Sequence, residues 1–594
     1  MSWHDSYFLL MYDMFFKGRS MSSSEQQLKE LLASVVASLY NIQTPPQITR
    51  TKQRQWGDFA SNIAMLLTKE LKLPPRDIAQ TIAHELSKSD WIVKVDIAGP
   101  GFINIFLSNY TKVAIINHVR QAPSLITPTD SPQKVIIEFV SANPTGPLHV
   151  GHGRAAALGS TIANLYEAYG HQVHREYYVN DAGNQMNILA LSVLLRYYAL
   201  HHDFSLLPFG CYQGAYISDI ARGIPTDKCS SDPSAFLHWL GTQESAIQEA
   251  FHSTQEHPAT LEALRLSTQW LKDQEPAYAW LQSYALTNIL DGIKKDLEDF
   301  RVRYDDYFYE SSLVPDAVSQ TLDRLAHLGL TETRDGALWF KASQVGDDKD
   351  RVLVRSNGEY TYFATDLAYH WHKSQRASHM LDLFGADHHG YCKRIQAGVN
   401  ALNTDAVCDI RIYQFVTLLR EGKKVGMSTR SGQFDTVRDV YDYCGVDAAR
   451  FFYLMRSCDQ HVEFDLDLAK SASQENPVYY VQYAHARICR ILDKEPAPSQ
   501  VNLTHLTQDL ESDLCLHLEQ YEKTISRCID SHDPQPLCTY LLDLAKMFHS
   551  YYNHVPVLKA ADDVRQARLA LLDAIRHHIA DGLALLGVSA PGQM

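Results

Sequence analysis

Hydrophobic and polar positions along this chain follow helical and strand periods in turn, and their order predicts several domains. Apolar residues recur every three or four positions from Leu28 to Leu39, which predicts an amphipathic helix. Helical patterns follow around 63–67 and 78–86, and strand-like runs at 92–97 and 102–106. We therefore expect an N-terminal α+β domain over residues 22–110 and a linker over 111–131, part of which is rich in Ser, Pro and Thr.

The rest of the chain divides into an α/β part and a helical part. A β-branched run at 135–137, a Pro/Gly-rich turn and a helical pattern ending at Gly170 open an α/β domain, which we expect over 132–395. Helical patterns without a strand motif at about 190–300 predict an insertion into this domain. Strand signals return at 338–340, 352–354 and 381–384. A mixed region over 396–475 leads to an almost wholly helical domain over 476–594, with its clearest helices at 540–552 and 565–586.

Composition narrows the class of protein. The chain has 594 residues, far more than one hydrophobic core usually supports, with 45% hydrophobic and 21% charged residues. No apolar run reaches membrane-spanning length, so we expect no membrane association. The net charge of −15 argues against nucleic-acid binding through bulk electrostatics, although local basic stripes remain compatible with RNA.

The cysteines and the first residues of the chain indicate the cellular compartment of the protein. Ten cysteines without a C-x-x-C pair predict neither a disulfide framework nor a structural zinc site, and a reducing cytoplasm fits best. Near the start, Asp13 interrupts an apolar run and no small-residue cleavage site follows. We therefore expect residues 1–21 to be an extension, with Met21 as the working start, rather than a signal peptide.

The most informative segment is the turn before the helix that begins near residue 150. It reads Asn143-Pro144-Thr145-Gly146-Pro147-Leu148-His149-Val150-Gly151-His152. A helix start exposes unpaired N–H groups and the positive end of the helix dipole, which favours anions. Histidines three positions apart lie on one side of that turn and can donate to phosphoryl oxygens. The segment therefore predicts a phosphate-handling site, and the alternative is a turn that merely closes a strand–helix unit.

Four ordered motifs resemble class I aminoacyl-tRNA synthetases, and specifically arginyl-tRNA synthetases. They are the H-x-G-H signature at 149–152, the segment Tyr362-Phe363-Ala364-Thr365-Asp366-Leu367, the segment Gly385-Ala386-Asp387-His388-His389-Gly390, and the signature loop Gly426-Met427-Ser428-Thr429-Arg430-Ser431-Gly432. The segments at 464–467, 476–480 and 482–487 resemble the entry to the family's helical anticodon-binding domain. The likeness covers nearly everything after residue 22.

The resemblance implies a fold and a reaction. The fold is a doubly wound, Rossmann-like catalytic core with an N-terminal α+β domain and a C-terminal all-α anticodon-binding domain. The implied enzyme activates L-arginine with ATP to arginyl-adenylate, releases pyrophosphate and transfers arginine to the arginine tRNA. Mg²⁺ would accompany ATP. The family is commonly monomeric and commonly needs bound tRNA for the first step.

The resemblance also implies substrate-binding residues. For ATP these are His149, Gly151, His152, Gly385, Asp387, His388, Met427, Ser428 and Thr429. Glu310, Tyr362 and Asp366 match acceptors of the arginine side chain, and a guanidinium pairs best with carboxylates. Glu138 and Asn143 match positions that hold the α-ammonium, with His149 beside them. Glu138 has a plain alternative, because a glutamate at a strand end is usually solvated, and Glu310 rests on a short match.

One departure from the family concerns the signature loop. The common form Lys-Met-Ser-Lys has neither lysine here, because Gly426 and Thr429 replace them, and the position of a compensating lysine holds Gly146. Nearby cations that can serve the leaving pyrophosphate are Lys423, Lys424 and Arg430. We favour Lys423 or Lys424 folding over with the loop, and the alternative is a solvated pair of surface lysines.

Candidate tRNA contacts follow from the same resemblance. Proteins usually recognise RNA by stacking its bases on aromatic side chains and by hydrogen bonding polar groups to the base edges. Phe102 and Asn104 match an N-terminal loop that contacts the tRNA corner, while Tyr483, Tyr552 and Met594 match anticodon contacts. Phe102 has core packing as an equal alternative, whereas Asn104 is harder to explain as a core residue.

Two other functions compete with this prediction. The missing lysines fit a non-catalytic tRNA-binding paralogue, although His149, His152, Asp366 and Asp387 are all present. Another class I synthetase is the third hypothesis. Its zinc-dependent members would need a Cys/His ligand set that we do not find, and an enzyme for an apolar substrate has no use for two carboxylates in one pocket.

Overall fold

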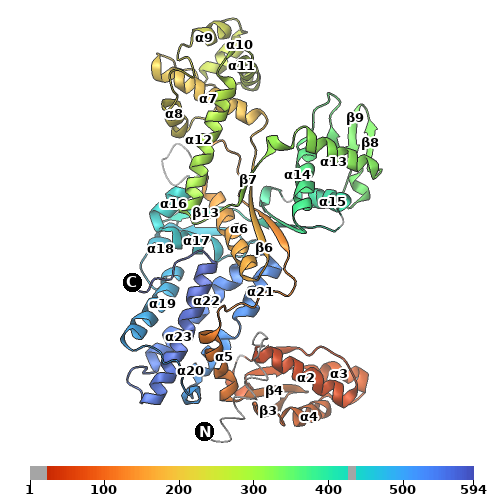
Figure 1. Ribbon diagram of the computed structural model, residues 1–594, viewed down its shortest axis with the longest axis vertical. Helices are drawn as coiled ribbons and strands as arrows, with labels where there is room; N and C mark the ends of the chain where they lie inside the picture. The colour runs from red at the N-terminus through yellow and green to blue at the C-terminus, as the bar shows by residue number, and fades with distance from the viewer. Residues whose placement is uncertain (1–22, 52, 254, 389, 404, 426–435) are drawn as a thin grey trace.

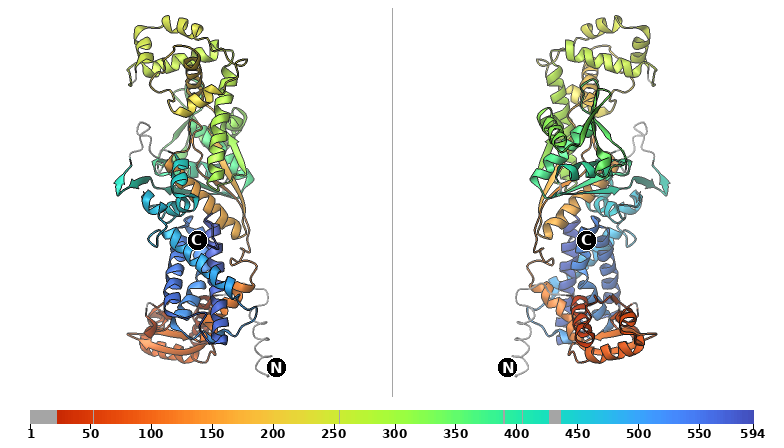
Figure 2. Two further views of the ribbon diagram at one scale, coloured as in Figure 1. Left: turned by 90° about the vertical axis from the view of Figure 1, so that its left-hand side faces the viewer. Right: turned by 90° about the vertical axis from the view of Figure 1, so that its right-hand side faces the viewer.

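The computed structural model describes residues 23–594 except 52, 254, 389, 404 and 426–435. The molecule is elongated, with a helical projection at one end and the N-terminal domain at the other (Figure 1). The helical C-terminal domain lies between the N-terminal domain and the catalytic sheet, and the side views agree on this order (Figure 2). The expected extension 1–21 lies outside the described residues.

The N-terminal domain packs three helices on an antiparallel sheet. The sheet has the order β1 (Ile48–Arg50), β2 (Phe59–Ser61), β4 (Phe102–Leu107) and β3 (Ile92–Ala98), and the helices are α2 (Ser24–Tyr40), α3 (Ile63–Leu71) and α4 (Pro75–Leu86). Ser23 caps α2, whose Leu28, Leu32 and Val36 are buried at helical spacing. Leu516 of the C-terminal domain completes this core.

A five-stranded parallel sheet forms the centre of the catalytic domain. Its order is β12 (Val407–Tyr413), β11 (His379–Gly385), β5 (Lys134–Glu138), β6 (Gln172–Val179) and β7 (Asp306–Tyr309). Helix α6 (Val150–Ala168) connects β5 to β6, and Gly170 turns the chain with a φ of 95°. The chain order changes direction beside β5, which is where α/β folds of this kind bind ligands.

Two groups of elements extend from this sheet. Between β6 and β7 lie the helices of the projection: α7 (Asn184–His201), α8 (Ala215–Arg222), α9 (Ser234–Gly241), α10 (Ser245–His252), α11 (Thr260–Gln274) and α12 (Tyr278–Asp299). Between β7 and β12 a smaller unit contains α13 (Asp316–His327), β8 (Thr331–Arg334), β9 (Ala337–Phe340), β10 (Arg351–Val354), α14 (Tyr362–Arg376) and α15 (Cys392–Leu402). The aromatic residues at 362–363 begin α14, because the Thr361 side chain caps the helix there.

The last third of the chain begins with a small sheet and ends in helices. The sheet has the order β14 (Lys423–Lys424), β13 (Val416–Arg420) and β15 (Val462–Asp465), beside α16 (Val437–Cys444), α17 (Val446–Leu454) and α18 (Leu466–Lys470). The C-terminal helices are α19 (Pro477–Lys494), α20 (Asp509–Leu518), α21 (Tyr521–Ser531), α22 (Gln535–His554) and α23 (Asp562–Leu585), and α5 (Asn109–Gln121) packs against α20 and α23.

A buried arginine joins three of these parts. Arg450 of α17 donates hydrogen bonds from Nε to the carbonyl of Leu586 (2.9 Å), from Nη1 to that of Phe300 (3.0 Å) and from Nη2 to Ser160 Oγ in α6 (2.8 Å). Burial lowers its pKa to about 9. Gly587 has a φ of 69°, and a Cβ there would lie 2.6 Å from the guanidinium, so glycine is required.

Candidate functional site

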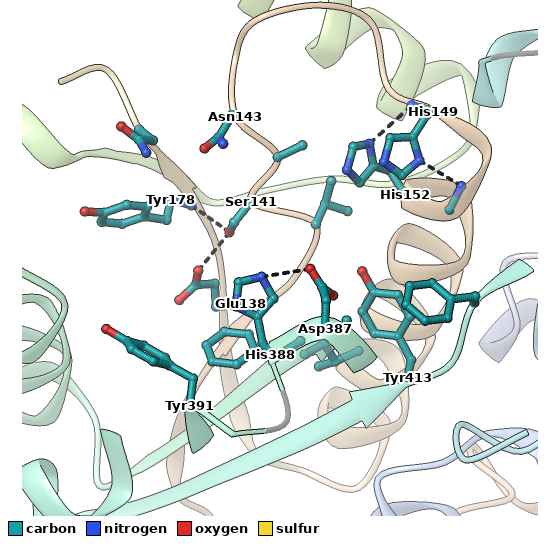
Figure 3. Close-up of a pocket in the computed structure, with 18 of the residues that line it drawn as sticks. Glu138, Ser141, Asn143, His149, His152, Tyr178, Asp387, His388, Tyr391 and Tyr413 are labelled. Atoms are coloured by element: carbon teal, nitrogen blue, oxygen red, sulfur yellow. Dashed lines mark hydrogen bonds and ion pairs between the residues drawn. The ribbon is translucent and has the colours of Figure 1, made fainter. Parts of the chain in front are cut away.

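A cavity of about 880 Å³ opens at the carboxyl ends of β5, β6, β11 and β12 (Figure 3). Ten of the residues that the sequence predicted for substrates line it: Glu138, Asn143, His149, Gly151, His152, Tyr362, Asp366, Gly385, Asp387 and His388. They come from segments more than 200 residues apart in the chain, which the parallel sheet brings to one edge.

The two histidines of the H-x-G-H turn form a capping box at the start of α6. His149 Nδ1 accepts the Gly151 N–H at 3.0 Å, and His152 Nδ1 accepts the His149 N–H at 3.2 Å. The rings stack with centroids 3.5 Å apart. Burial lowers both pKa values, that of His152 to about 3, where the neighbouring His149 also contributes. Both rings are therefore neutral at pH 7, with Nδ1 as acceptor and Nε2–H as the remaining donor.

A strained turn after β5 arranges the floor of the cavity. Val140 and Ser141 have φ values of 68° and 38°, in the left-handed region that a β-branched residue rarely adopts. This conformation lets Ser141 Oγ donate to Glu138 Oε1 at 2.9 Å and accept the Tyr178 N–H at 3.0 Å (Figure 3). Glu138 is buried rather than solvated, so the plain alternative for it is wrong.

A buried lysine holds the carboxylates of two adjacent strands. Lys373 Nζ lies 2.7 Å from Glu138 Oε2 and 2.5 Å from Asp382 Oδ1, and His370 Nε2 lies 2.8 Å from Asp382 Oδ2. Burial would lower the pKa of Lys373, but Asp382 and Glu138 outweigh it and raise that pKa. The ammonium group thus fills the centre of a cluster that otherwise has the residue types of a metal site.

Two carboxylates, Asp366 and Glu310, lie beside this floor and are called the acidic wall below. Asp366 accepts a hydrogen bond from the Tyr391 hydroxyl, and burial raises its pKa. Glu310 does not line the cavity itself but lies next to Asn180, which does, and the Asn180 amide donates to its Oε2 at 2.8 Å. Burial, then the charges of Asp366 and Asp181, raise the pKa of Glu310 to about 7. Two carboxylates that repel each other in this way favour a bound cation.

The glycine-flanked segment after β11 presents Asp387 and His388 to the cavity. Asp387 Oδ2 and His388 Nε2 lie 3.4 Å apart, and both side chains point inward (Figure 3). A Cβ at Gly385 would lie 2.5 Å from Asp387 Oδ1, so this glycine allows the carboxylate its position. A Cβ at Gly390 would meet nothing within 4 Å.

Two of the three predicted pyrophosphate cations, Lys423 and Lys424, are not brought into the cavity. Lys423 and Lys424 form β14, are exposed, and do not line it. Gly426, Met427, Ser428, Thr429 and Arg430 lie outside the described residues.

The structure exposes one of the two N-terminal tRNA candidates and buries the other, which is the one that the sequence made harder to explain as a core residue. Phe102, at the start of β4, is 42% exposed, so its core alternative is wrong. Asn104 is 6% exposed on the central part of the sheet, paired in register with Ala60 and Asp96. Both residues lie on the same face of β4, but Asn104 has a paired strand on each side, whereas Phe102, the first residue of the strand, pairs only with Ala98.

The C-terminal candidates gather along α19. Arg487 lies between two aromatic rings, 4.5 Å from the centroid of Tyr483 and 4.9 Å from that of Tyr552. Its Nη2 donates to the Tyr483 hydroxyl at 2.6 Å. One turn further on, Arg490 donates to the carbonyl oxygen of Met594. Tyr552 and Met594 are exposed.

Several residues of the site escaped sequence reasoning. Ser141, Tyr178, Lys373, His370 and Tyr391 act through contacts between strands and helices distant in sequence. His370 and Lys373, one turn apart on α14, were the only local signal.

Comparison with known proteins agrees with this arrangement. Family models match as "Arginyl tRNA synthetase N terminal domain" at residues 26–107, "tRNA synthetases class I (R), catalytic domain" at 115–204 and 269–455, and "DALR anticodon binding domain" at 481–594. The arginine–tRNA ligase of Thioalkalivibrio sulfidiphilus is 42% identical over 96% of this chain and 100% of its own length. The chain belongs to the arginyl-tRNA synthetase family. A relative from Coxiella burnetii, also an arginine–tRNA ligase, is 43% identical over 97% of this chain and all of its own.

Solved arginyl-tRNA synthetase structures share the fold. The putative enzyme from Campylobacter jejuni has a TM-score of 0.68 at 30% identity and covers 82% of this chain and all of its own. The enzyme from Thermus thermophilus has a TM-score of 0.72 at 22% identity, over 96% of this chain and all of its own. The hypothesis of another class I synthetase is therefore wrong. Across the described residues, no helix combines the length and apolar character needed to cross a membrane.

Proposed function

We propose that this chain is an arginine–tRNA ligase that uses the cavity at the carboxyl edge of the sheet for both steps. A carboxylate oxygen of L-arginine attacks the α-phosphorus of ATP, and pyrophosphate leaves with the bonding electron pair. A 3′-terminal ribose hydroxyl of the arginine tRNA then attacks the carbonyl carbon of arginyl-adenylate, and AMP leaves. The observation that carries the proposal is that the H-x-G-H histidines and Asp366 line one cavity, with Glu310 next to its lining residue Asn180.

The histidine turn would stabilise the phosphates of ATP. His149 and His152 each present Nε2–H from a helix start whose dipole favours negative charge. Charge spreads over the phosphoryl oxygens during displacement, and donors fixed in advance stabilise it without reorganising. Mg²⁺ would enter with ATP on its phosphate oxygens. Lys423 or Lys424 would supply a cation for pyrophosphate, being the nearest described lysines before the signature loop.

The acidic wall would select arginine. Asp366 in the cavity wall, and Glu310 next to the lining residue Asn180, would offer carboxylate oxygens to a guanidinium, and Tyr362, 71% exposed at the cavity rim, would add a phenol. At the other end, Glu138 and Asn143 would bind the α-ammonium group. The Lys373 bridge keeps Glu138 in one orientation for this role.

The aromatic and basic face of α19 supports tRNA binding. Tyr552 and Met594 are exposed there, while Arg487 fixes the rings of Tyr483 and Tyr552. Phe102 would contact the tRNA from the N-terminal domain, and because Asn104 is buried, its part would be to hold the strand.

The deciding experiment is arginine-dependent ATP–pyrophosphate exchange, with and without arginine tRNA. Exchange that requires arginine and tRNA supports the proposal in full, whereas exchange without tRNA keeps the ligase and removes the tRNA requirement. Lysine in place of arginine is the specificity control. Tight tRNA binding with no exchange would instead identify a non-catalytic tRNA-binding protein and make the missing signature-loop lysines the reason.

A further inference from the structure

A second cluster of ligand-type side chains lies at the opposite edge of the catalytic sheet. His379 begins β11, Asp409 lies on the adjacent strand β12, and His532 caps the C-terminal end of α21 in the helical domain. His379 is paired in register with Val407, so Asp409 projects from the same face two residues further on. His532 has a φ of 49°, a left-handed conformation that ends the helix and turns the chain.

The three ligand atoms converge on one point. His379 Nε2 lies 2.9 Å from Asp409 Oδ2, His532 Nε2 lies 3.5 Å from the same oxygen, and all three atoms lie within 4.8 Å of one another. Zinc bonds to imidazole and carboxylate of about 2.0–2.2 Å place tetrahedral ligands about 3.3 Å apart. The two shortest distances between ligand atoms, 2.9 and 3.5 Å, lie below and above this value. Small side-chain rotations would therefore allow the three atoms to coordinate one ion.

The surroundings of the cluster fit a metal as well. His532 Nδ1 lies 3.0 Å from the Tyr166 hydroxyl, and a hydrogen bond at the second ring nitrogen is what orients metal-binding histidines. Asp409 and His532 line an open pocket of about 560 Å³, which gives an ion and a fourth, water ligand access. Asp530 lines the same pocket.

Two other clusters of similar composition already contain a cation. Lys373 lies within the group Glu138, His370 and Asp382, while Arg376 donates two hydrogen bonds to Glu176 in the group with His174 and Asp306. In the part of the chain that the structure describes, the ion pairs of Asp409 run only to His379 and His532. Arg411, on the same strand, pairs instead with Asp459 and Asp533.

We propose that His379, Asp409 and His532 bind one Zn²⁺ ion, or a divalent transition metal of similar ligand preference, that links the catalytic sheet to the helical domain. Two ligands come from the sheet and one from the turn after α21, so the bound metal would join the sheet to the helical domain. The site lies at the amino end of β11, and Gly385 of the catalytic cavity lies at its carboxyl end, about 20 Å away. Its role would be structural, so zinc binding here would correct the expectation, drawn from the cysteines, that the chain has no structural zinc site.

The test is zinc binding by the untagged, full-length protein. After dialysis against a chelator, the protein is titrated with Zn²⁺ alone in competition with a chromophoric chelator, because exposed histidines such as His327 offer weak surface sites. We expect one competing ion per chain and a higher melting temperature when zinc is present. Asp409→Asn and His532→Asn should weaken binding at least tenfold, and Tyr166→Phe about tenfold through the second shell. His327→Asn, an exposed histidine of α13 outside the clusters, is the matched control.

Cobalt substitution tests the site in the wild-type protein, so its result does not depend on whether the variants fold. Co²⁺ bound to wild-type protein at this site should give the visible absorption of a four-coordinate ion, and one equivalent of Zn²⁺ should abolish it. Failure of wild-type protein to compete for zinc would overturn the proposal and leave the cluster as an ion pair. Equal zinc binding by wild type, Asp409→Asn and His532→Asn would overturn it too, by placing the metal elsewhere.

Discussion

His149 and His152 stack face to face, and each uses Nδ1 to accept a backbone N–H of the same helical turn. The capping contacts therefore fix the tautomer as well as the position of both rings. Each ring keeps one donor, Nε2–H, and neither carries a charge at neutral pH. Neutral donors can bind phosphate without the large desolvation penalty of a buried cation.

Replacing His152 with Asn should lower kcat for ATP–pyrophosphate exchange by about 10²–10³, the usual effect of losing one donor to a developing charge. Asparagine can still cap the helix but does not reach as far as Nε2. The KM for arginine should change little, because the acidic wall is untouched. His201→Asn, at the end of α7, is the control. An unchanged kcat would remove His152 from the reaction.

The KM for arginine should depend on pH through Glu310. Its pKa of about 7 means that the carboxyl loses its charge as the pH falls below neutrality. Only the ionised form pairs with a guanidinium, so the KM should rise by up to about tenfold per unit below pH 7 and be flat above it. Glu310→Gln should give a higher KM with no such rise. A wild-type KM that is constant from pH 5.5 to 8 would contradict the assignment.

Asp366→Asn should raise the KM for arginine about 10- to 100-fold, because a hydrogen bond to a charged group contributes about 1.5–3 kcal/mol. Tyr391→Phe should have a smaller effect, since the tyrosine only orients the carboxylate. Asp405→Asn, in an exposed loop before β12, serves as the matched control. Steady-state kinetics with varied arginine measure all three, and unchanged values for Asp366→Asn would remove it from the pocket.

Lys373→Met should destabilise the catalytic domain by about 3–5 kcal/mol, because it leaves Glu138 and Asp382 as uncompensated buried charges. Calorimetry should show a lower melting temperature for the transition that includes this domain. Adding Asp382→Asn should restore part of the loss, since the double variant removes one carboxylate with the lysine. A single variant as stable as wild type would show that the cluster contributes nothing measurable.

Tyr552→Ala should weaken tRNA binding by about 1–3 kcal/mol if a base stacks on the ring. Direct tRNA binding is the measurement, because it is independent of catalysis. Leu558→Ala removes a similarly exposed apolar side chain from the same domain and should leave affinity unchanged. Equal losses in both variants would indicate a general disturbance of the domain rather than stacking.

Sequence patterns were most informative for features that depend on residues close together in the chain. The periodic burial of α2, the runs that became β3, β4 and β11, and the turn around His149 all follow from neighbours in the chain. The cavity was predictable because parallel strands end at one edge, so motifs that follow those strands must meet.

What escaped prediction depends on contacts between distant segments. The left-handed turn at Val140 and Ser141 occurs at residues with no preference for it, and tertiary contacts hold it there. The Lys373 bridge joins positions 235 residues apart. The difference in exposure between Phe102 and Asn104 depends on how far β2 extends along β4, which periodicity alone does not give.

The hydrogen bonds of Arg450 show that the domains predicted from the sequence are not independent of one another in the folded protein. A chain shortened by its last nine residues would lack Leu586, whose carbonyl this guanidinium uses, leaving a buried cation with fewer partners beside the helix that begins at the H-x-G-H histidines. The residues after α23 thus help to hold α6 in place through Arg450, so a change near the C-terminus would reach the cavity through these hydrogen bonds.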